Sequence, residues 1–332
     1  MSDTDQPDQP IDGFDWPLFG WCDDVRAALG ETLDAGRPAA LATLYRVEGS
    51  APRGAGAQML FDGSRAAGYF SGDCIEGDVA RHAAQVLNDG EARHLHYGFG
   101  SPWIDIRLRC GGALHILVER IAPGDAAAAA LLDHAHRRVP CRYRTNGNAR
   151  AVLPAEDGSA LLVRGEATFA LTRRYDPARR VIVSGGDPGA LAVAKLAADA
   201  RFETILLRPG GPESPPPFPV SAYLREEPEA ALARLGVDRW TAYLGATHED
   251  HHDLGGCLAA LRGEAGYVGM IGAKSRAAGR IAALRQAGAS EAELARLRLS
   301  PGIAGLGKSP WEVATGIMAE VMAALNPALE RA

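Results

Sequence analysis

The sequence has little of what marks a nucleic-acid-binding, membrane or secreted protein. Aromatic residues make up 6% of its 332 residues, the formal net charge is −6, and no run of Lys and Arg is interleaved with aromatic residues. A chain of this kind has no basic surface that could bind the phosphates of a nucleic acid, so we expect no nucleic-acid partner. No apolar stretch approaches the ~20 residues that span a bilayer, and the acidic N-terminus lacks a signal-peptide core. We therefore expect no membrane partner and a cytoplasmic location.

Cysteine is also scarce, and its spacing excludes two common uses of the residue. The five thiols are odd in number, widely separated and without a CxxC pair; they are Cys22, Cys74, Cys110, Cys141 and Cys257. Neither a disulfide framework nor a standard structural zinc site is indicated by this pattern. Each thiol must therefore be interpreted from its own surroundings.

The composition that remains is that of a globular protein. The chain is 47% hydrophobic and 23% charged, which suits packed cores, and its length exceeds what one ordinary core fills. We expect a disordered Asp-, Gln- and Pro-rich tail over 1–15 and a first domain over 16–173. In this domain, helices over 16–35, 75–89 and 124–138 accompany short strands, one of them over 103–108. A linker over 174–180 and a second domain over 181–332 follow. Strand and helix alternate in the second domain at parallel-sheet spacing. Near its end, Ser309 followed by Pro310 and Glu312 predicts the start of a helix. The predicted fold class is α/β: an N-terminal mixed α/β domain followed by a Rossmann-like, doubly wound domain.

The stretch "VIVSGGDPGALA" lies where a Rossmann domain places its phosphate-binding turn. Gly185 supplies the first glycine, but Asp187 occupies the position of the second, where a carboxylate repels a phosphate at close range. The second strand ends in Leu207-Arg208, so the acidic residue expected to bind a ribose is missing. The turn therefore leaves three alternatives open: ordinary dinucleotide binding, a purely structural turn, or a different ligand.

A second polar stretch, "GATHEDHHDLGG" (245–256), follows a predicted strand and so lies at the edge where open α/β sheets carry their sites. Its candidate metal ligands are His248, Asp250, His251, His252 and Asp253, although their spacing matches no standard metal motif. The alternative is a helix N-terminus at which the aspartates interact favourably with the dipole and the histidines are solvated. A ligand contact made by His248 is the third interpretation.

Cys74 lies in "FSGDCIEGDVARHAAQV", just after Gly72 and at the predicted start of a helix. Free N–H groups and the helix dipole favour the thiolate there, the form that attacks sulfur or binds metal. The acidic neighbours on both sides oppose this, and a lone cysteine also serves as a small buried apolar residue. Cys110 lies between Arg109 and two glycines, in a loop where the backbone can approach a ligand. The other three thiols are expected to be structural.

Several separated stretches agree with one family. "ALATLYRVEGSAPRGAGAQMLF", "GYFSGDCIEGDVARHA" and "RLRCGGALHILVE" resemble the N-terminal domain of the XdhC/CoxI family of xanthine dehydrogenase accessory proteins. "ATHEDHHDL", "YVGMIGAKSRAAGRIAALRQAGASEAELARL" and "SPWEVATGIMAEV" resemble its Rossmann-type domain. The matches run in the right order from about residue 25 to 325.

The resemblance implies that the protein transiently binds molybdenum cofactor (molybdopterin), holds it while a cysteine desulfurase helps install its terminal sulfur, and delivers it to a molybdenum hydroxylase apo-enzyme such as xanthine dehydrogenase. A homodimer is expected. The implied cofactor-binding residues are Gly49, Ser50, Cys74, Glu76, Cys110, Gly111 and Gly112 in the first half and Gly185, Gly186, His248 and Asp253 in the second. Cys74 and Cys110 are the implied metal contacts, since molybdenum and its sulfur suit a soft thiolate.

Three departures from the family pattern leave alternatives open. Where the family has Gly-Gly-Cys, this chain has Gly72-Asp73-Cys74. The family's Gly-Ala-Gly-His turn is replaced by Gly185-Gly186-Asp187-Pro188, and its Asp-Arg pair after the second strand is replaced by Leu207-Arg208. No complete catalytic constellation is recognisable, which favours a non-catalytic chaperone. An NAD(P)-dependent oxidoreductase or other nucleotide-binding enzyme using the Rossmann-like half is the alternative, and a protein–protein adaptor is a third.

Overall fold

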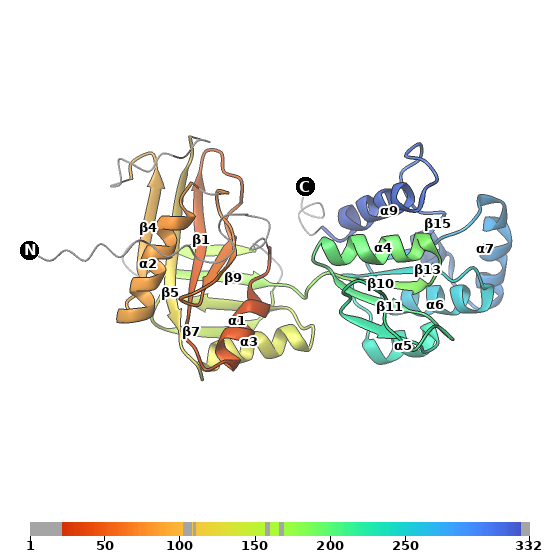
Figure 1. Ribbon diagram of the computed structural model, residues 1–332, viewed down its shortest axis with the longest axis horizontal. Coiled ribbons are helices and arrows are strands. Elements are labelled where there is room, and N and C mark those ends of the chain that lie inside the picture. The colour runs from red at the N-terminus through yellow and green to blue at the C-terminus, as the bar shows by residue number, and fades with distance from the viewer. Residues whose placement is uncertain are drawn as a thin grey trace, which may run out of the picture. The chain divides into compact units, whose positions relative to one another are not determined.

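The computed structural model describes residues 22–326 except 73, 102–107, 109–110, 157–159 and 166–168. Two compact units make up the chain; the first ends at Pro177 and the second begins at Ala178 (Figure 1). The tail expected over 1–15, Cys110, and all but the last residue of a strand predicted over 103–108 lie outside the described residues. Within the described ranges, every helix is too short or too polar to span a bilayer.

A five-stranded antiparallel sheet forms the centre of the first unit. Its strands lie in the order β3-β2-β1-β5-β4. They are β1 (Ala39–Glu48), β2 (Gln58–Phe61), β3 (Ala66–Gly68), β4 (Arg93–Gly98) and β5 (Ala113–Ile121). The first six residues of β1 are all buried, because both faces of the sheet are covered there, and half-buried and exposed positions alternate only towards its end. This accounts for the unbroken apolar run at the start of the strand.

Different elements cover the two faces of this sheet. The helices of the unit are α1 (Arg26–Asp34), α2 (Glu76–Asp89) and α3 (Ala126–His136). Leu44 and Ile116 pack with the apolar side of α2, whereas Leu41 packs on the opposite face with α1, α3 and a second sheet. A helix was predicted from Trp16; α1 begins at Arg26, and residues 22–25 are not helical.

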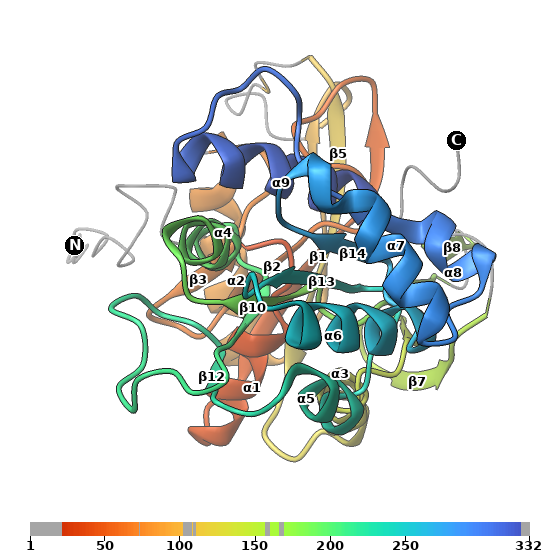
Figure 2. The ribbon, with the colours of Figure 1, turned by 90° about the vertical axis from the view of Figure 1, so that its right-hand side faces the viewer.

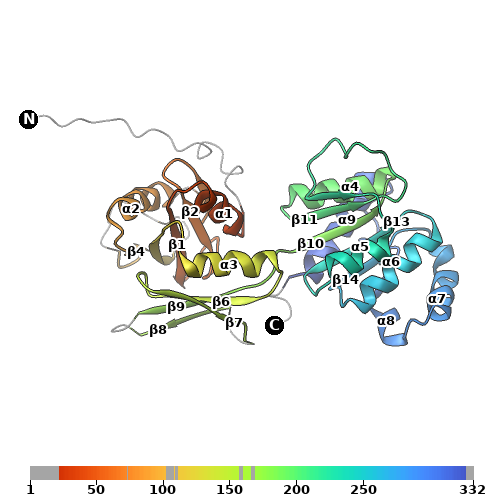
Figure 3. The same cartoon turned by 90° about the horizontal axis from the view of Figure 1, so that it is seen from below.

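The second sheet of this unit has four antiparallel strands in the order β7-β6-β9-β8, and α3 lies along it (Figure 3). The strands are β6 (Cys141–Thr145), β7 (Arg150–Pro154), β8 (Leu161–Arg164) and β9 (Ala170–Tyr175). Strand β7, which is short and only partly buried, was not predicted from the sequence. The Asn146-Gly147 pair before it, a common hairpin signal, is what could have revealed it.

The second unit is a doubly wound parallel sheet, as predicted. Its strands lie in the order β12-β11-β10-β13-β14-β15 and all neighbours are parallel. They are β10 (Arg180–Gly185), β11 (Glu203–Leu207), β12 (Ala222–Leu224), β13 (Thr241–Ala246), β14 (Tyr267–Met270) and β15 (Leu297–Leu299). The chain leaves β10 towards β11 on one side and later returns to pair β13 on the other. The carboxyl ends of β10 and β13 therefore flank the switch point where such sheets bind ligands.

Helices cover both faces of the parallel sheet (Figure 2). They are α4 (Pro188–Asp199) and α9 (Pro310–Ala324) on one face, and α5 (Pro228–Leu235), α6 (Asp250–Arg262), α7 (Ala277–Gln286) and α8 (Glu291–Arg296) on the other. The predicted start of α9 is confirmed: the Ser309 side chain accepts a hydrogen bond from the Glu312 amide, Pro310 is the first helical residue, and the Glu312 side chain bonds back to the Ser309 amide.

Candidate functional site

In the first unit, antiparallel pairing brings the predicted site loops to one end of the five-stranded sheet. The last residue of β1, Glu48, pairs with Ala113, the first residue of β5, and Gly98 at the end of β4 pairs with Ala113 from the other side. Gly68, at the end of β3, pairs with Met59 opposite the middle of β1, and the chain leaves β3 in the same direction as it leaves β1. The turn after β1 and the segment before β5 therefore leave the sheet together. The loop after β3 runs towards the same end, and there the Arg53 guanidinium lies over the Tyr69 ring at 4.4 Å from its centroid.

Two of these segments are in backbone contact. A Cβ atom on Gly112 would overlap the Ser50 carbonyl oxygen and lie 2.7 Å from the Glu48 carbonyl oxygen, so only glycine fits there. Gly111 has a φ of 72° and Gly49 a φ of 71°, in the left-handed region that favours glycine. Gly49, Ser50 and Gly111 are exposed beside the buried Gly112. The structure thus brings these four predicted residues together.

Cys74 is carried by the loop that precedes α2, and Glu76 shapes this loop. The buried Glu76 carboxylate accepts hydrogen bonds through Oε1 from the amides of Phe70 (3.0 Å), Ser71 (2.6 Å) and Gly72 (3.0 Å). Its Oε2 accepts from the Ser71 hydroxyl at 2.6 Å and from the Ile75 amide at 3.2 Å. Glu76 is 3% exposed, so this ring of donors replaces water around its charge.

These contacts also explain the ionisation of Glu76. Burial by itself raises the pKa of a carboxyl group, but the hydrogen bonds from the Ser71 hydroxyl and from the Ser71 and Phe70 amides outweigh it, and the pKa of Glu76 is lowered from its ordinary value. The group is charged at neutral pH and holds residues 70–72 and Ile75 around it.

Cys74 is half-buried and lies before the first helical residue of α2, with Ile75 as the N-cap. Its side chain packs against the core on the α2 side of the sheet. Free amide groups were expected around the thiol, but its own N–H donates to the Ser71 hydroxyl at 3.0 Å and the Ile75 N–H is taken by Ser71 and Glu76. The loop therefore positions the thiol through Ser71 and Glu76, while most of its nearby amides are already bonded.

A cavity of about 630 Å³ in the first unit was not predicted. It is lined by Tyr45, Arg46, His94, His115, Val163, Gly165 and Phe169. The Phe169 ring packs edge-on against Tyr45 at 5.1 Å and against His94 at 4.5 Å between ring centroids. Burial lowers the pKa of His94, and burial lowers that of His115 although Glu48 lies 3.1 Å from its Nε2. The walls are thus mainly aromatic and uncharged at neutral pH, with Arg46 as the cation.

In the second unit, the glycines of the β10–α4 turn are required by close neighbours. A Cβ on Gly185 would lie 2.8 Å from the Ala246 carbonyl carbon, and one on Gly186 would lie 2.7 Å from Cζ of Arg208. Leu207, the last residue of β11, stands where an acidic residue would bind a ribose. The guanidinium group of the next residue, Arg208, lies against the glycine turn, a contact that was not predicted from the sequence.

Asp187 is the N-cap of α4. Its Oδ1 accepts the Ala190 amide at 2.7 Å, and its Oδ2 lies 3.0 Å from Nε2 of His248. A carboxylate of the protein thus occupies the anion position at this helix N-terminus, where a pyrophosphate would otherwise sit. His248, exposed and with a φ of 64°, reaches the turn from the end of β13.

Asp253 is completely buried beneath the loop that carries His248. Its Oδ1 accepts hydrogen bonds from the Thr247 amide at 3.0 Å and from the Thr247 hydroxyl at 2.8 Å. Its Oδ2 is 3.7 Å from the buried Arg280 guanidinium. Gly185, Gly186, His248 and Asp253 therefore lie at one switch point, with Asp253 acting on the loop rather than on the surface.

Both units match models of the same protein family. The model of the XdhC Rossmann domain matches residues 181–321, and the model of the XdhC and CoxI family matches residues 32–98. The two matches fall in the second and the first unit respectively. They come in the same order as the motifs identified in the sequence.

Two curated relatives cover most of the chain. It is 28% identical over 305 residues to the molybdenum cofactor insertion chaperone PaoD of Escherichia coli (strain K12), covering 90% of this chain and 88% of PaoD. It is 26% identical over 277 residues to a probable xanthine dehydrogenase subunit of Bacillus subtilis (strain 168), covering 75% and 83%. A crystal structure of a xanthine dehydrogenase from Bacillus halodurans has the same fold, with a TM-score of 0.68, 22% identity, and coverage of 90% and 95%.

Proposed function

Because the chain belongs to the XdhC and CoxI family, we propose that it binds molybdenum cofactor as cargo and delivers it to a molybdenum hydroxylase. PaoD, a molybdenum cofactor insertion chaperone, is similar over nearly the whole length of both chains. In this proposal the protein acts in the cytoplasm as a homodimer. It receives the cofactor, holds it while a cysteine desulfurase supplies the terminal sulfur, and releases it to the apo-enzyme.

The observation that carries the proposal is the contact between two glycine-containing segments at one end of the five-stranded sheet, towards which the loop after β3 also runs. Exposed backbone at Gly49 and Gly111, beside the small side chain of Ser50, permits close approach, which suits a phosphate-bearing pterin. Cys74 lies on the loop after β3 and is a soft donor for molybdenum or its sulfur. Cys110, directly before Gly111 in the chain, is proposed as the second thiol.

The second unit supports a chaperone better than a nicotinamide-dependent enzyme. Asp187 fills the anion position at α4, and Arg208 lies against Gly186. We propose that Gly185, Gly186 and His248 contact a part of the cargo other than a dinucleotide pyrophosphate, and that Asp253 holds the His248 loop in place. Glu76 has the corresponding positioning role for Cys74.

The proposal is tested by purifying the protein from cells that synthesise the cofactor and identifying the small molecule it carries by mass spectrometry. We expect molybdopterin or a nucleotide-linked form of it. Reconstitution of an apo-hydroxylase with the loaded protein should restore hydroxylase activity, and light scattering should report a dimer. Saturable NAD(H) binding with hydride transfer, and no pterin, would instead identify an oxidoreductase.

A further inference from the structure

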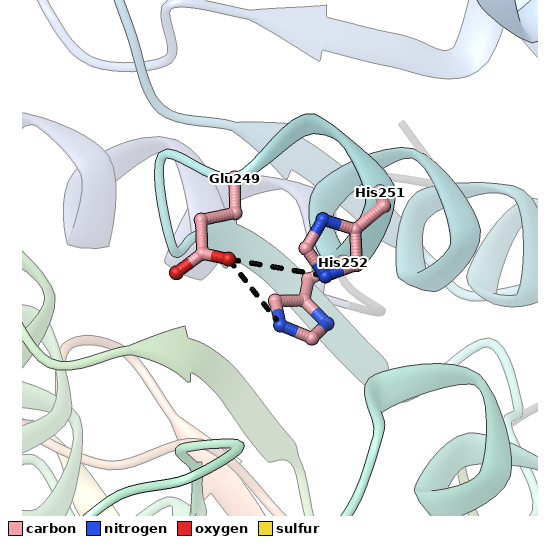
Figure 4. Close-up of side chains that lie close together, drawn as sticks. All are labelled: Glu249, His251 and His252. Atoms are coloured by element: carbon pink, nitrogen blue, oxygen red, sulfur yellow. Dashed lines mark ion pairs between the residues drawn. The ribbon is translucent and has the colours of Figure 1, made fainter.

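Three side chains at the N-terminus of α6 face one another without belonging to the site described above. Glu249, His251 and His252 each direct one potential ligand atom into the same small region, and these atoms lie within 4.8 Å of one another (Figure 4). Their neighbours are engaged elsewhere: His248 pairs with Asp187, and Asp250 pairs with Arg276. The structure thus separates the polar stretch 248–253 into residues with different partners.

The distances fit an ion between the side chains better than direct hydrogen bonds. Oε2 of Glu249 lies 3.8 Å from Nε2 of His251 and 3.7 Å from Nε2 of His252, which is too long for hydrogen bonds. Two ligand atoms held about 2.1 Å from a tetrahedral ion are about 3.4 Å apart. Shifts of a few tenths of an ångström would therefore bring each histidine to that spacing from Glu249, and rotation of the imidazoles, whose ligand nitrogens lie within 4.8 Å of each other, would complete the set around a metal.

His252 is already oriented for such a role. Its side chain is 12% exposed, and its Nδ1 lies 2.6 Å from the carboxylate of Glu227, which comes from the start of α5. This ion-pair contact does not have hydrogen-bond geometry, but it places a carboxylate beside Nδ1 and leaves Nε2 as the ligand atom, an arrangement found in many metal-binding histidines. Nε2 is the atom on the side of Glu249.

We propose that Glu249, His251 and His252 bind one divalent transition-metal ion of the Zn²⁺ class. Two imidazoles and a carboxylate are a donor set that suits Zn²⁺ and its neighbours in the first transition row and gives Mg²⁺ or Ca²⁺ too few oxygens. Three protein ligands leave at least one coordination position for water or an external donor. The positive end of the α6 dipole opposes a cation here, and the charges of Glu249 and Glu227 offset it.

The test uses tag-free, full-length protein stripped of metal with a chelator, because a histidine tag would bind the same ions. Calorimetric titration with Zn²⁺ should give saturable binding that excess Mg²⁺ does not displace. Glu249→Gln and His251→Asn should each weaken Zn²⁺ binding at least tenfold. Their side chains are 64% and 69% exposed, so both variants should keep the wild-type melting temperature.

Two further variants separate the roles in the cluster. Glu227→Gln should weaken binding by about tenfold through the lost orientation of His252. His136→Asn, at an exposed histidine in the other unit, is the matched control and should leave binding unchanged. Titration with Co²⁺ should give visible d–d absorption without thiolate charge transfer, which distinguishes this site from one formed by cysteines.

The proposal is overturned by absence of saturable Zn²⁺ binding, by unchanged affinity in Glu249→Gln and His251→Asn, or by a Co²⁺ spectrum dominated by thiolate charge transfer. All of these measurements are made without molybdenum cofactor, so their outcome is independent of the proposed chaperone function.

Discussion

Replacing Glu76 with Gln should destabilise the first unit and disturb the loop that carries Cys74. Oε1 accepts three backbone amides, and Oε2 accepts the Ser71 hydroxyl and the Ile75 amide. A glutamine has the same shape but one acceptor oxygen, so its NH₂ group must face at least one buried donor whichever way it is turned. The substitution thus removes the charge and leaves donors without an acceptor.

The size of the effect follows from these contacts. One hydrogen bond to a charged group is worth about 1.5–3 kcal/mol, and a buried donor left unsatisfied costs about 1–3 kcal/mol. Because the five contacts share one carboxylate, their values do not add, and we expect a loss of about 3 kcal/mol in the free energy of unfolding. For a unit of this size, that loss lowers the melting temperature by roughly 6–12 °C.

The pH dependence provides a second check. The pKa of Glu76 is lowered in the folded state, so its contribution is fully present above the ordinary value of about 4.3 and is lost as the pH falls through the lower folded value. The difference between wild type and Glu76→Gln, followed by circular dichroism during thermal unfolding, should therefore be constant near neutral pH and shrink in acid. Glu91→Gln, at an exposed glutamate of the same unit, is the control. A Glu76→Gln melting temperature within about 2 °C of wild type at pH 7 would refute this account of the loop.

Three further substitutions test the proposed site. Cys74→Ala should leave the melting temperature nearly unchanged but weaken cofactor retention. Cys141→Ala, at a fully buried thiol, should lower the free energy of unfolding by about 1 kcal/mol or more and leave cofactor binding per folded molecule intact. The reverse pattern would make Cys74 the structural thiol. Asp187→Gly should raise the affinity for nucleotides, measured by calorimetry, because it removes the carboxylate from the α4 N-terminus. The loss of the cap should cost only a few tenths of a kcal/mol in stability. If no nucleotide binds more tightly, this turn does not face a phosphate. Gly112→Ala should destabilise the first unit by about 1–3 kcal/mol in urea unfolding, since the added Cβ overlaps the Ser50 carbonyl oxygen, and wild-type stability would contradict the contact.

Much of the fold could be predicted because it depends on short stretches of sequence. The alternation of strand and helix after residue 180 specifies parallel crossovers, and Ser309, Pro310 and Glu312 fix the start of α9 through contacts within one turn. Strand β7 was missed because its five residues, four partly buried and one exposed, carry little periodicity. The start of α1 was misplaced because no capping signal marks it.

In the candidate site, too, some features could be predicted from short stretches of sequence and others could not. The resemblance of short motifs to the family selected Gly49, Ser50 and Gly112, and the local sequence by itself singled out Cys74 and placed His248 at a strand end. Tertiary structure alone decided which atoms meet. The loop amides surround the charge of Glu76, Arg208 covers Gly186, and Glu227 from the start of α5 contacts His252 on α6. Local propensity and capping depend on residues a few positions apart, whereas these contacts depend on strand pairing and helix packing between distant segments, and no single stretch of the sequence specifies them.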